Sequence, residues 1–91
     1  MLPEGGYVVV GHFPMGGGDN DWFWIVQVHE GNARVVLFER GDAIRIRPQW
    51  HHGFHDIELD WGVGGRWGRR TYAFNGSNYT LIRQWSHEGN R

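Results

Sequence analysis

The sequence of 91 residues contains no cysteine and no lysine, and each absence is informative. Without cysteine there can be neither a disulfide framework nor a zinc–thiolate site. Because lysine is absent, all nine Lys/Arg positions are arginine. The planar guanidinium of arginine pairs with carboxylates and stacks on aromatic rings. Long apolar runs are also missing, since the longest are strand-sized and a membrane span needs roughly 20 residues. We expect no membrane insertion.

An excess of charge of either sign is absent too. Nine arginines face ten acidic residues, for a net charge of −1, which argues against a nucleic-acid binder held by phosphate contacts. The first residues lack the basic start and apolar segment of a secretory signal. We therefore expect a periplasmic or secreted location if a signal peptide has been removed, and a cytoplasmic one otherwise.

The chain is instead rich in glycine, with 15 residues, and in aromatic residues, at 15%. Its apolar residues form short β-branched and aromatic runs separated by Gly, Asn and Asp, a pattern typical of strands. We predict an all-β fold: a single small antiparallel domain whose meanders and hairpins form a sandwich or a partly open barrel. About seven short strands are expected, near residues 7–10, 22–28, 33–38, 43–47, 55–61, 70–74 and 79–85.

Two halves of this single domain, approximately 6–38 and 53–85, follow a similar series of strands and turns. Each half is expected to be a three-stranded meander, with strand 43–47 between them. This order suggests an internal two-fold pseudo-repeat. Chance similarity between glycine-punctuated strands is the alternative explanation.

Alternation is sharpest in residues 55–61, where the acids Asp56, Glu58 and Asp60 fall on one face and apolar residues on the other. The preceding strand places Arg45 and Arg47 on its outer face in the same way. We predict that these two strands pair, bringing an arginine within salt-bridge reach of an acid. The predicted core includes five residues: Ile44, Ile46, Ile57, Leu59 and Leu81.

Other local signals complete the predicted layout. Residues 22–28 are apolar on both faces, which indicates a central strand covered on each side. Pro48 is expected to end strand 43–47, because proline cannot donate to a β-ladder. Residues 49–53 and 62–68 are expected to be loops, and Gly31-Asn32 and Asn75-Gly76 are expected to form turns.

The second half carries the most recognisable string, Gly53-Phe54-His55-Asp56-Ile57 followed by Tyr72-Ala73-Phe74-Asn75-Gly76 and Tyr79. It resembles small bacterial secreted or periplasmic β domains with a Gly-Tyr/Phe-x-Asp-Ile opening and a later Tyr-x-Phe-Asp-Gly-x-x-Tyr hairpin, and is loosely similar to FG-GAP blades. Asn75 stands where these domains usually have aspartate. The resemblance covers about a third of the chain. It implies a bacterial binding module and names no ligand.

Signals for catalysis or metal binding are few. His51, His52 and His55, beside Asp56, are the one cluster with metal-ligand residue types. Adjacent histidines in a loop seldom point at one ion, so solvated histidines are the favoured interpretation. No serine lies in a nucleophile-elbow context. We expect no enzymatic activity and no cofactor, and retain a small metal-binding or enzymatic protein as a second alternative.

Aromatic residues are the strongest functional signal, because six tryptophans are hard to bury in so small a domain. We predict that Trp50 and Trp67, with Arg66 and Arg69, form or border a contact surface, since Trp and Arg dominate protein interfaces. The predicted function is a non-enzymatic binding module for a protein or glycan partner. The first alternative is a structural subunit that self-associates through exposed β edges into a homo-oligomer.

Overall fold

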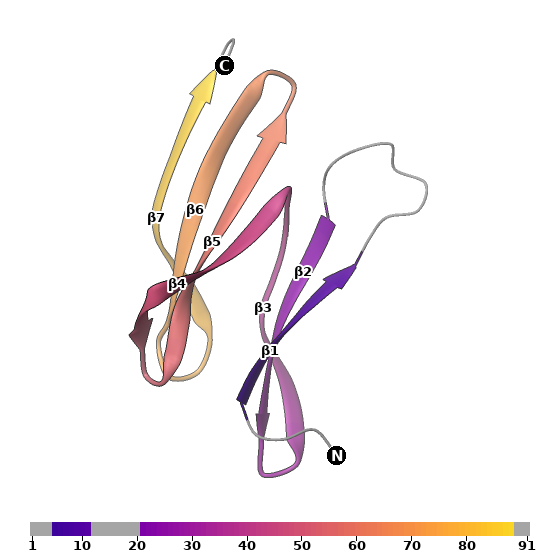
Figure 1. The fold of residues 1–91 in the computed structure, drawn as a ribbon, viewed down its shortest axis with the longest axis vertical. Helices are drawn as coiled ribbons and strands as arrows, with labels where there is room; N and C mark the ends of the chain where they lie inside the picture. The colour runs from indigo at the N-terminus through magenta and orange to yellow at the C-terminus, as the bar shows by residue number, and fades with distance from the viewer. Residues whose placement is uncertain (1–4, 12–20, 89–91) are drawn as a thin grey trace.

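The computed structural model describes residues 5–11 and 21–88, which form seven antiparallel strands and no helix. Consecutive strands pair into a three-stranded sheet, β1-β2-β3, and a four-stranded sheet, β4-β5-β6-β7 (Figure 1). The all-β prediction is confirmed, with two separate sheets and no closed barrel. No helix in these residues could cross a membrane. The strands are β1 (Gly5–Gly11), β2 (Asp21–His29), β3 (Asn32–Gly41), β4 (Ala43–His51), β5 (Phe54–Val63), β6 (Arg66–Phe74) and β7 (Tyr79–Glu88).

The two sheets pack together around a small apolar core. Sequential pairing produces a meander in each sheet, with β4 added to the edge of the second meander. Arg70 of β6 reaches Glu39 of β3 across the sandwich, with 3.9 Å between charged atoms. Alternation along the strands supplies the core residues from the facing sides: Phe23, Ile25, Val36, Leu37, Ile57, Leu59, Tyr72, Phe74 and Tyr79.

Two predicted core residues lie at the margins of this packing. Ile46 is 59% exposed and Leu81 is 45% exposed, so the prediction that both are buried is wrong. Each shares a cross-strand row with the buried Ile57 and Tyr72. They belong to β4 and β7, the two edge strands of a four-stranded sheet that a three-stranded sheet covers only in part. Ile57 and Leu59 are buried as predicted, and Ile44 packs against the core.

A sharp corner carries the chain from one sheet to the other. Only Asp42 separates β3 from β4, and its N–H donates to the carbonyl of Asp60 at 2.6 Å. A Cβ on the preceding Gly41 would lie 2.8 Å from the same carbonyl oxygen. Glycine is therefore required here, because the corner lies directly against β5.

Three hairpins share one turn geometry in which both central residues have positive φ. These pairs are Glu30–Gly31, His52–Gly53 and Gly64–Gly65. Two-residue turns of this kind match the twist of antiparallel strands. The first turn therefore lies one residue before the predicted Gly31–Asn32. The predicted loops 49–53 and 62–68 are wrong in extent, because strands continue to the edges of two-residue turns.

The expected end of a strand at Pro48 is also wrong. β4 continues to His51, although its register with β5 shifts between Ile46 and Trp50. Proline is tolerated there because β4 is an edge strand and the missing N–H can face away from β5.

The connection between β6 and β7 is a four-residue loop that includes the predicted Asn75–Gly76 turn. The side-chain oxygen of Asn75 accepts the backbone N–H groups of Ser77 and Asn78 at 2.8 and 2.9 Å. Arg34 of β3 donates to the carbonyl of Ser77 and thereby ties this loop to the other sheet.

Candidate functional site

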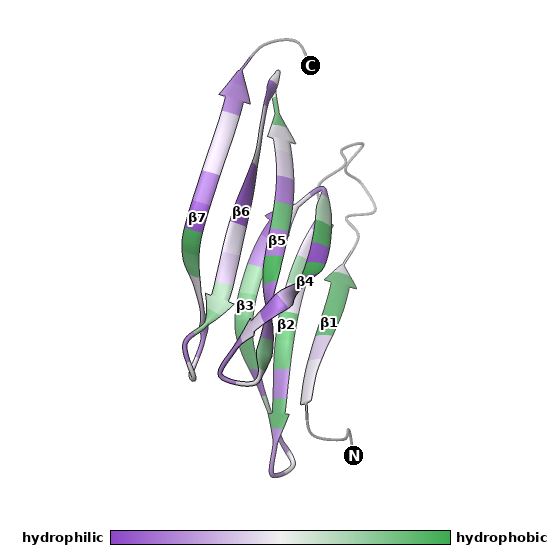
Figure 2. Cartoon of the chain, turned by 60° about the vertical axis from the view of Figure 1, so that its left-hand side comes forward, coloured by the Kyte–Doolittle hydropathy of each residue, from purple (hydrophilic) through white to green (hydrophobic). Residues whose placement is uncertain are grey.

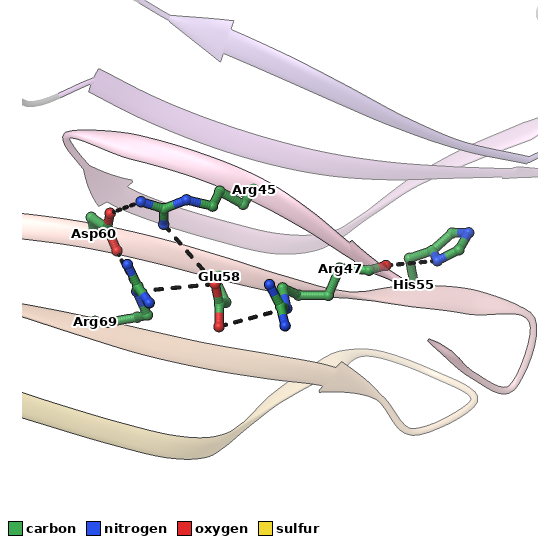
Figure 3. Close-up of polar contacts among 6 residues, drawn as sticks. All are labelled: Arg45, Arg47, His55, Glu58, Asp60 and Arg69. Carbon is green, nitrogen blue, oxygen red and sulfur yellow. Dashed lines mark hydrogen bonds and ion pairs between the residues drawn. The ribbon is translucent and has the colours of Figure 1, made fainter. Parts of the chain in front are cut away.

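The outer face of the four-stranded sheet carries a network of arginines and acids. β4 and β5 pair with each other as predicted, and Arg45 lies opposite Glu58. Arg45 hydrogen-bonds to Asp60 and lies 4.0 Å from Glu58, and Arg47 lies 3.7 Å from Glu58 (Figure 3). The predicted ion pairing of the two strands is confirmed.

Asp60 is the best-paired acid of the network. It accepts a hydrogen bond from Arg45 on β4 and another from Arg69 Nε on β6 at 2.8 Å (Figure 3). These hydrogen bonds and the two positive charges lower the pKa of Asp60 to about 2, although partial burial opposes the shift. Asp60 therefore links three neighbouring strands.

The other two acids have different neighbours: Glu58 lies near the arginines, whereas Asp56 accepts a hydrogen bond from His51. Asp56 and Glu58 alternate with the core residues of β5 as predicted, yet both are buried. The aliphatic parts of neighbouring arginines can cover a sheet face and leave the guanidinium groups in water. Glu58 lies within 4.0 Å of Arg45, Arg47 and Arg69, but its Oε1 has no hydrogen-bond partner among the described residues.

An aromatic cluster borders this network. Trp67 lies in β6, packs edge-on against Trp85 with ring centroids 5.2 Å apart, and stacks on His87 at 5.1 Å. The guanidinium of Arg69 lies over the Trp85 ring at 5.7 Å. We call the surface formed by Arg45, Arg47, Arg69, Trp67 and Trp85 the arginine–tryptophan face.

The four predicted contact residues do not all meet. Trp67 and Arg69 lie on one face of β6, whereas Arg66 alternates to the other face and approaches Glu88 of β7 at 3.5 Å. Trp50 and Trp67 pair with His55 and Gly62, near opposite ends of β5. His55 and Gly62 are seven positions apart on β5, so the two tryptophans lie far from each other along the sheet. Trp50 is 64% exposed and stacks on His55.

The histidines of the second hairpin have separate partners. His51 Nδ1 donates to the buried Asp56 at 2.8 Å, and His55 Nδ1 donates to the carbonyl of Arg47 at 2.8 Å. His52 occupies a positive-φ turn position. Within residues 5–11 and 21–88, no three His, Asp or Glu side chains are grouped to hold a metal ion.

A small cavity of about 180 Å³ opens between the sheets beside β1. Tyr79 lines it and donates its hydroxyl to the carbonyl of His55 at 2.7 Å. Burial, with a smaller contribution from the charge of Asp56, raises the pKa of Tyr79 to about 12. This tyrosine therefore stays protonated at neutral pH. The lining is mainly apolar: Val8, Ile25, Ile46, Phe54, Ile57 and Tyr79.

The outer face of the three-stranded sheet is apolar, which the sequence did not predict. β2 was expected to be covered on both sides, but the four-stranded sheet covers only the side of Phe23 and Ile25. Figure 2 shows that hydrophobic residues predominate along β1 and β2, whereas much of β7 is hydrophilic. We call the uncovered surface the aromatic face; its residues are Val9, Trp22, Trp24, Val35 and Phe38.

Stacked rings cross the aromatic face between β2 and β3. Phe38 stacks on Trp22 with centroids 4.9 Å apart and on Trp24 at 5.1 Å. Arg40 lies over the Trp22 ring at 4.8 Å. Val9, Val35 and Phe38 are each about half exposed. A signal for this face existed in the sequence, because most outward positions of the three strands are apolar, with Arg40 as an exception.

Comparison of the chain with protein-family models, with curated proteins and with solved structures gave no match.

Proposed function

We propose that this chain is a non-catalytic binding module that holds a protein partner against its aromatic face. The supporting observation is a contiguous apolar surface across β1, β2 and β3, with Val9, Val35 and Phe38 half exposed. Apolar residues scattered singly over a surface are ordinary, whereas a contiguous apolar patch marks an interaction site. Tryptophan and arginine at such a patch are the residue types that dominate interface energetics.

The ring geometry favours a protein over a glycan. A sugar ring stacks on an open aromatic face, but Phe38 is stacked between Trp22 and Trp24. Arg40 occupies a further ring face of Trp22. The aromatic face therefore presents mainly ring edges and valine side chains. Such a surface suits apolar side chains of a protein partner.

Selection from a library of displayed peptides tests this proposal. We expect enriched peptides to be rich in apolar and aromatic residues. The double substitution Val9→Glu with Val35→Glu should weaken their binding about tenfold or more, because each carboxylate would be desolvated at the interface.

Val63→Glu is the matched control, since Val63 is also an exposed strand valine but lies on the four-stranded sheet. It should leave peptide binding unchanged. Peptides that bind the double variant as tightly as the native chain would contradict the assignment to the aromatic face.

The arginine–tryptophan face is a second candidate surface, suited to an anionic partner. Its acids Asp56 and Glu58 are buried, whereas Arg45, Arg47 and Arg69 keep about a third or more of their side-chain surface in solvent. The outermost charge of this face is therefore positive. This candidate retains Trp67 and Arg69 as contact residues; Arg66 alternates to the other face of β6, and Trp50 lies at the other end of the sheet.

Trp67→Ala distinguishes binding from structural support at the second surface. If the face holds an anionic partner, binding of a polyglutamate peptide should weaken by about 2 kcal/mol while the melting temperature changes little. A lower melting temperature with unchanged peptide binding would contradict this role and leave Trp67 as a packing residue for Trp85 and His87.

A further inference from the structure

The edge strand β7 is exposed along almost its whole length. All of its residues after Tyr79 are exposed, and they include the large apolar side chains of Leu81, Ile82 and Trp85. β7 pairs with β6 on one side, and no described strand pairs with its other side. The backbone N–H and C=O groups on that side form a template on which another strand can pair.

The other three edges are less suited to pairing. β4 contains Pro48 and an irregular register after Ile46. β3 is interrupted by a bulge beside Val36 and held by Arg34 to the loop between β6 and β7. β1 has seven residues, three of which are glycine, and glycine weakens a strand. The bulge in β3 leaves regular runs of four and five residues, whereas β7 keeps a regular run of six, Arg83–Glu88, beyond its own bulge. Proline and bulges are devices that protect sheet edges.

We propose that β7 pairs with β7 of a second copy of this chain, joining two four-stranded sheets into one continuous antiparallel sheet. Ile82 is an extra residue in the pairing with β6, because Thr71 and Tyr72 pair with Arg83 and Leu81. The regular part of β7 is therefore Arg83–Glu88. A symmetric dimer must pair like faces, since the two-fold axis is perpendicular to the sheet.

The register that uses this regular part best has Trp85 on the two-fold axis. Trp85 then lies opposite Trp85 of the second copy, and an aromatic pair of this kind stabilises neighbouring strands. Gln84 lies opposite Ser86 of the second copy, a neutral polar pair. Arg83 lies opposite His87, so no two arginines face each other. This register places no two arginines and no two acids opposite each other and pairs the exposed Trp85 rings, which favours a second copy as the occupant.

Light scattering after size exclusion, at several protein concentrations, tests the proposal on the full chain. Short edge-to-edge contacts are small interfaces, so we expect a reversible dimer with a Kd on the order of 10–100 μM. A chain that remains monomeric at concentrations well above this range would overturn the proposal.

Charge substitutions on β7 locate the interface. Gln84→Lys with Ser86→Lys defines a lysine variant, and Gln84→Glu with Ser86→Glu defines a glutamate variant. Like charges would face each other across the two-fold axis in either variant, so each alone should dimerise about tenfold more weakly or not at all. An equal mixture should dimerise again, because opposite charges then meet.

A folding measurement and a control variant accompany these substitutions. Circular dichroism establishes that each variant is folded, and Gln49→Glu on the edge strand β4 is the matched control that should dimerise normally. A dimer unaffected by both β7 variants would assign association to another surface. A mixture that stays monomeric, although each variant is folded, would also overturn β7 pairing. Neither result depends on whether the aromatic face binds a peptide.

Discussion

At the scale of single residues, paired charges determine how this protein responds to acid. Asp60 accepts hydrogen bonds from Arg45 and Arg69, and its pKa of about 2 lies below its ordinary value of 3.8. A carboxylate whose pKa is lower in the folded chain stabilises the fold at every pH above the ordinary value. That stabilisation is lost as the pH falls from about 4 to about 2. In this range Asp60 is protonated first in the unfolded chain and then in the folded chain, so the two states no longer differ in charge.

Asp60→Asn should therefore lower the free energy of unfolding by about 1–2 kcal/mol at neutral pH, the smaller figure reflecting solvent screening of a partly exposed group. The difference between the native chain and the variant should disappear near pH 2. Urea unfolding at a series of pH values measures this. Glu88→Gln, which removes an exposed partner of Arg66, is the control and should change stability by less than about 0.5 kcal/mol.

At the scale of the elements, the hairpins combine a favourable turn type with two unfavourable residues. Glu30 and His52 occupy positive-φ positions, at 52° and 54°. A side chain other than Gly, Asn or Asp is strained there, because its Cβ crowds the following carbonyl. The third hairpin avoids the strain by placing Gly64 at the equivalent position.

Glu30→Asn and His52→Asn should each stabilise the protein by about 0.5 kcal/mol, since asparagine tolerates this conformation at the first position of such a turn. Thermal unfolding should show a higher melting temperature for each variant and a near-additive gain for the pair, because the two turns belong to different sheets. Ser77→Asn, at a loop position without positive φ, should have no effect. A lower melting temperature for both turn variants would contradict the turn geometry.

At the scale of the whole molecule, stability depends on a few residues where the two sheets overlap. Leu59 lies at this centre and is the one large side chain among the described residues that is completely buried. Ile46 and Leu81 belong to the same facing surface but lie on its uncovered margins. Their contributions to folding should differ accordingly, although all three are branched aliphatic residues.

Leu59→Ala should lower the free energy of unfolding by about 2–5 kcal/mol through lost burial and a residual cavity. Ile46→Ala and Leu81→Ala should each cost about 1 kcal/mol or less, because much of each side chain is already in water. Urea unfolding of the three variants gives the comparison. Equal losses of unfolding free energy in the three variants would show that the margins are covered in solution. For Leu81→Ala, a loss that grows with protein concentration would indicate the β7 dimer.

The sequence by itself determined the strands, their alternation and one pairing with its ion pairs. Arg45, Glu58 and Asp60 were predictable because alternation and cross-strand pairing act between neighbours on one sheet. The position of the first hairpin turn was predictable to within a residue, at Gly31, since turn conformations depend on local sequence.

Only the tertiary structure decided which faces are covered. The same apolar alternation produces a buried Ile57, an exposed Ile46 and an open face at Trp24. Periodicity alone therefore cannot predict which of these side chains the other sheet covers. Coverage depends on which sheets stack and how many strands each contributes, and those contacts join residues far apart in the chain. The separation of Trp50 from Trp67 has the same cause, because strand register, rather than loop composition, places them near opposite ends of β5.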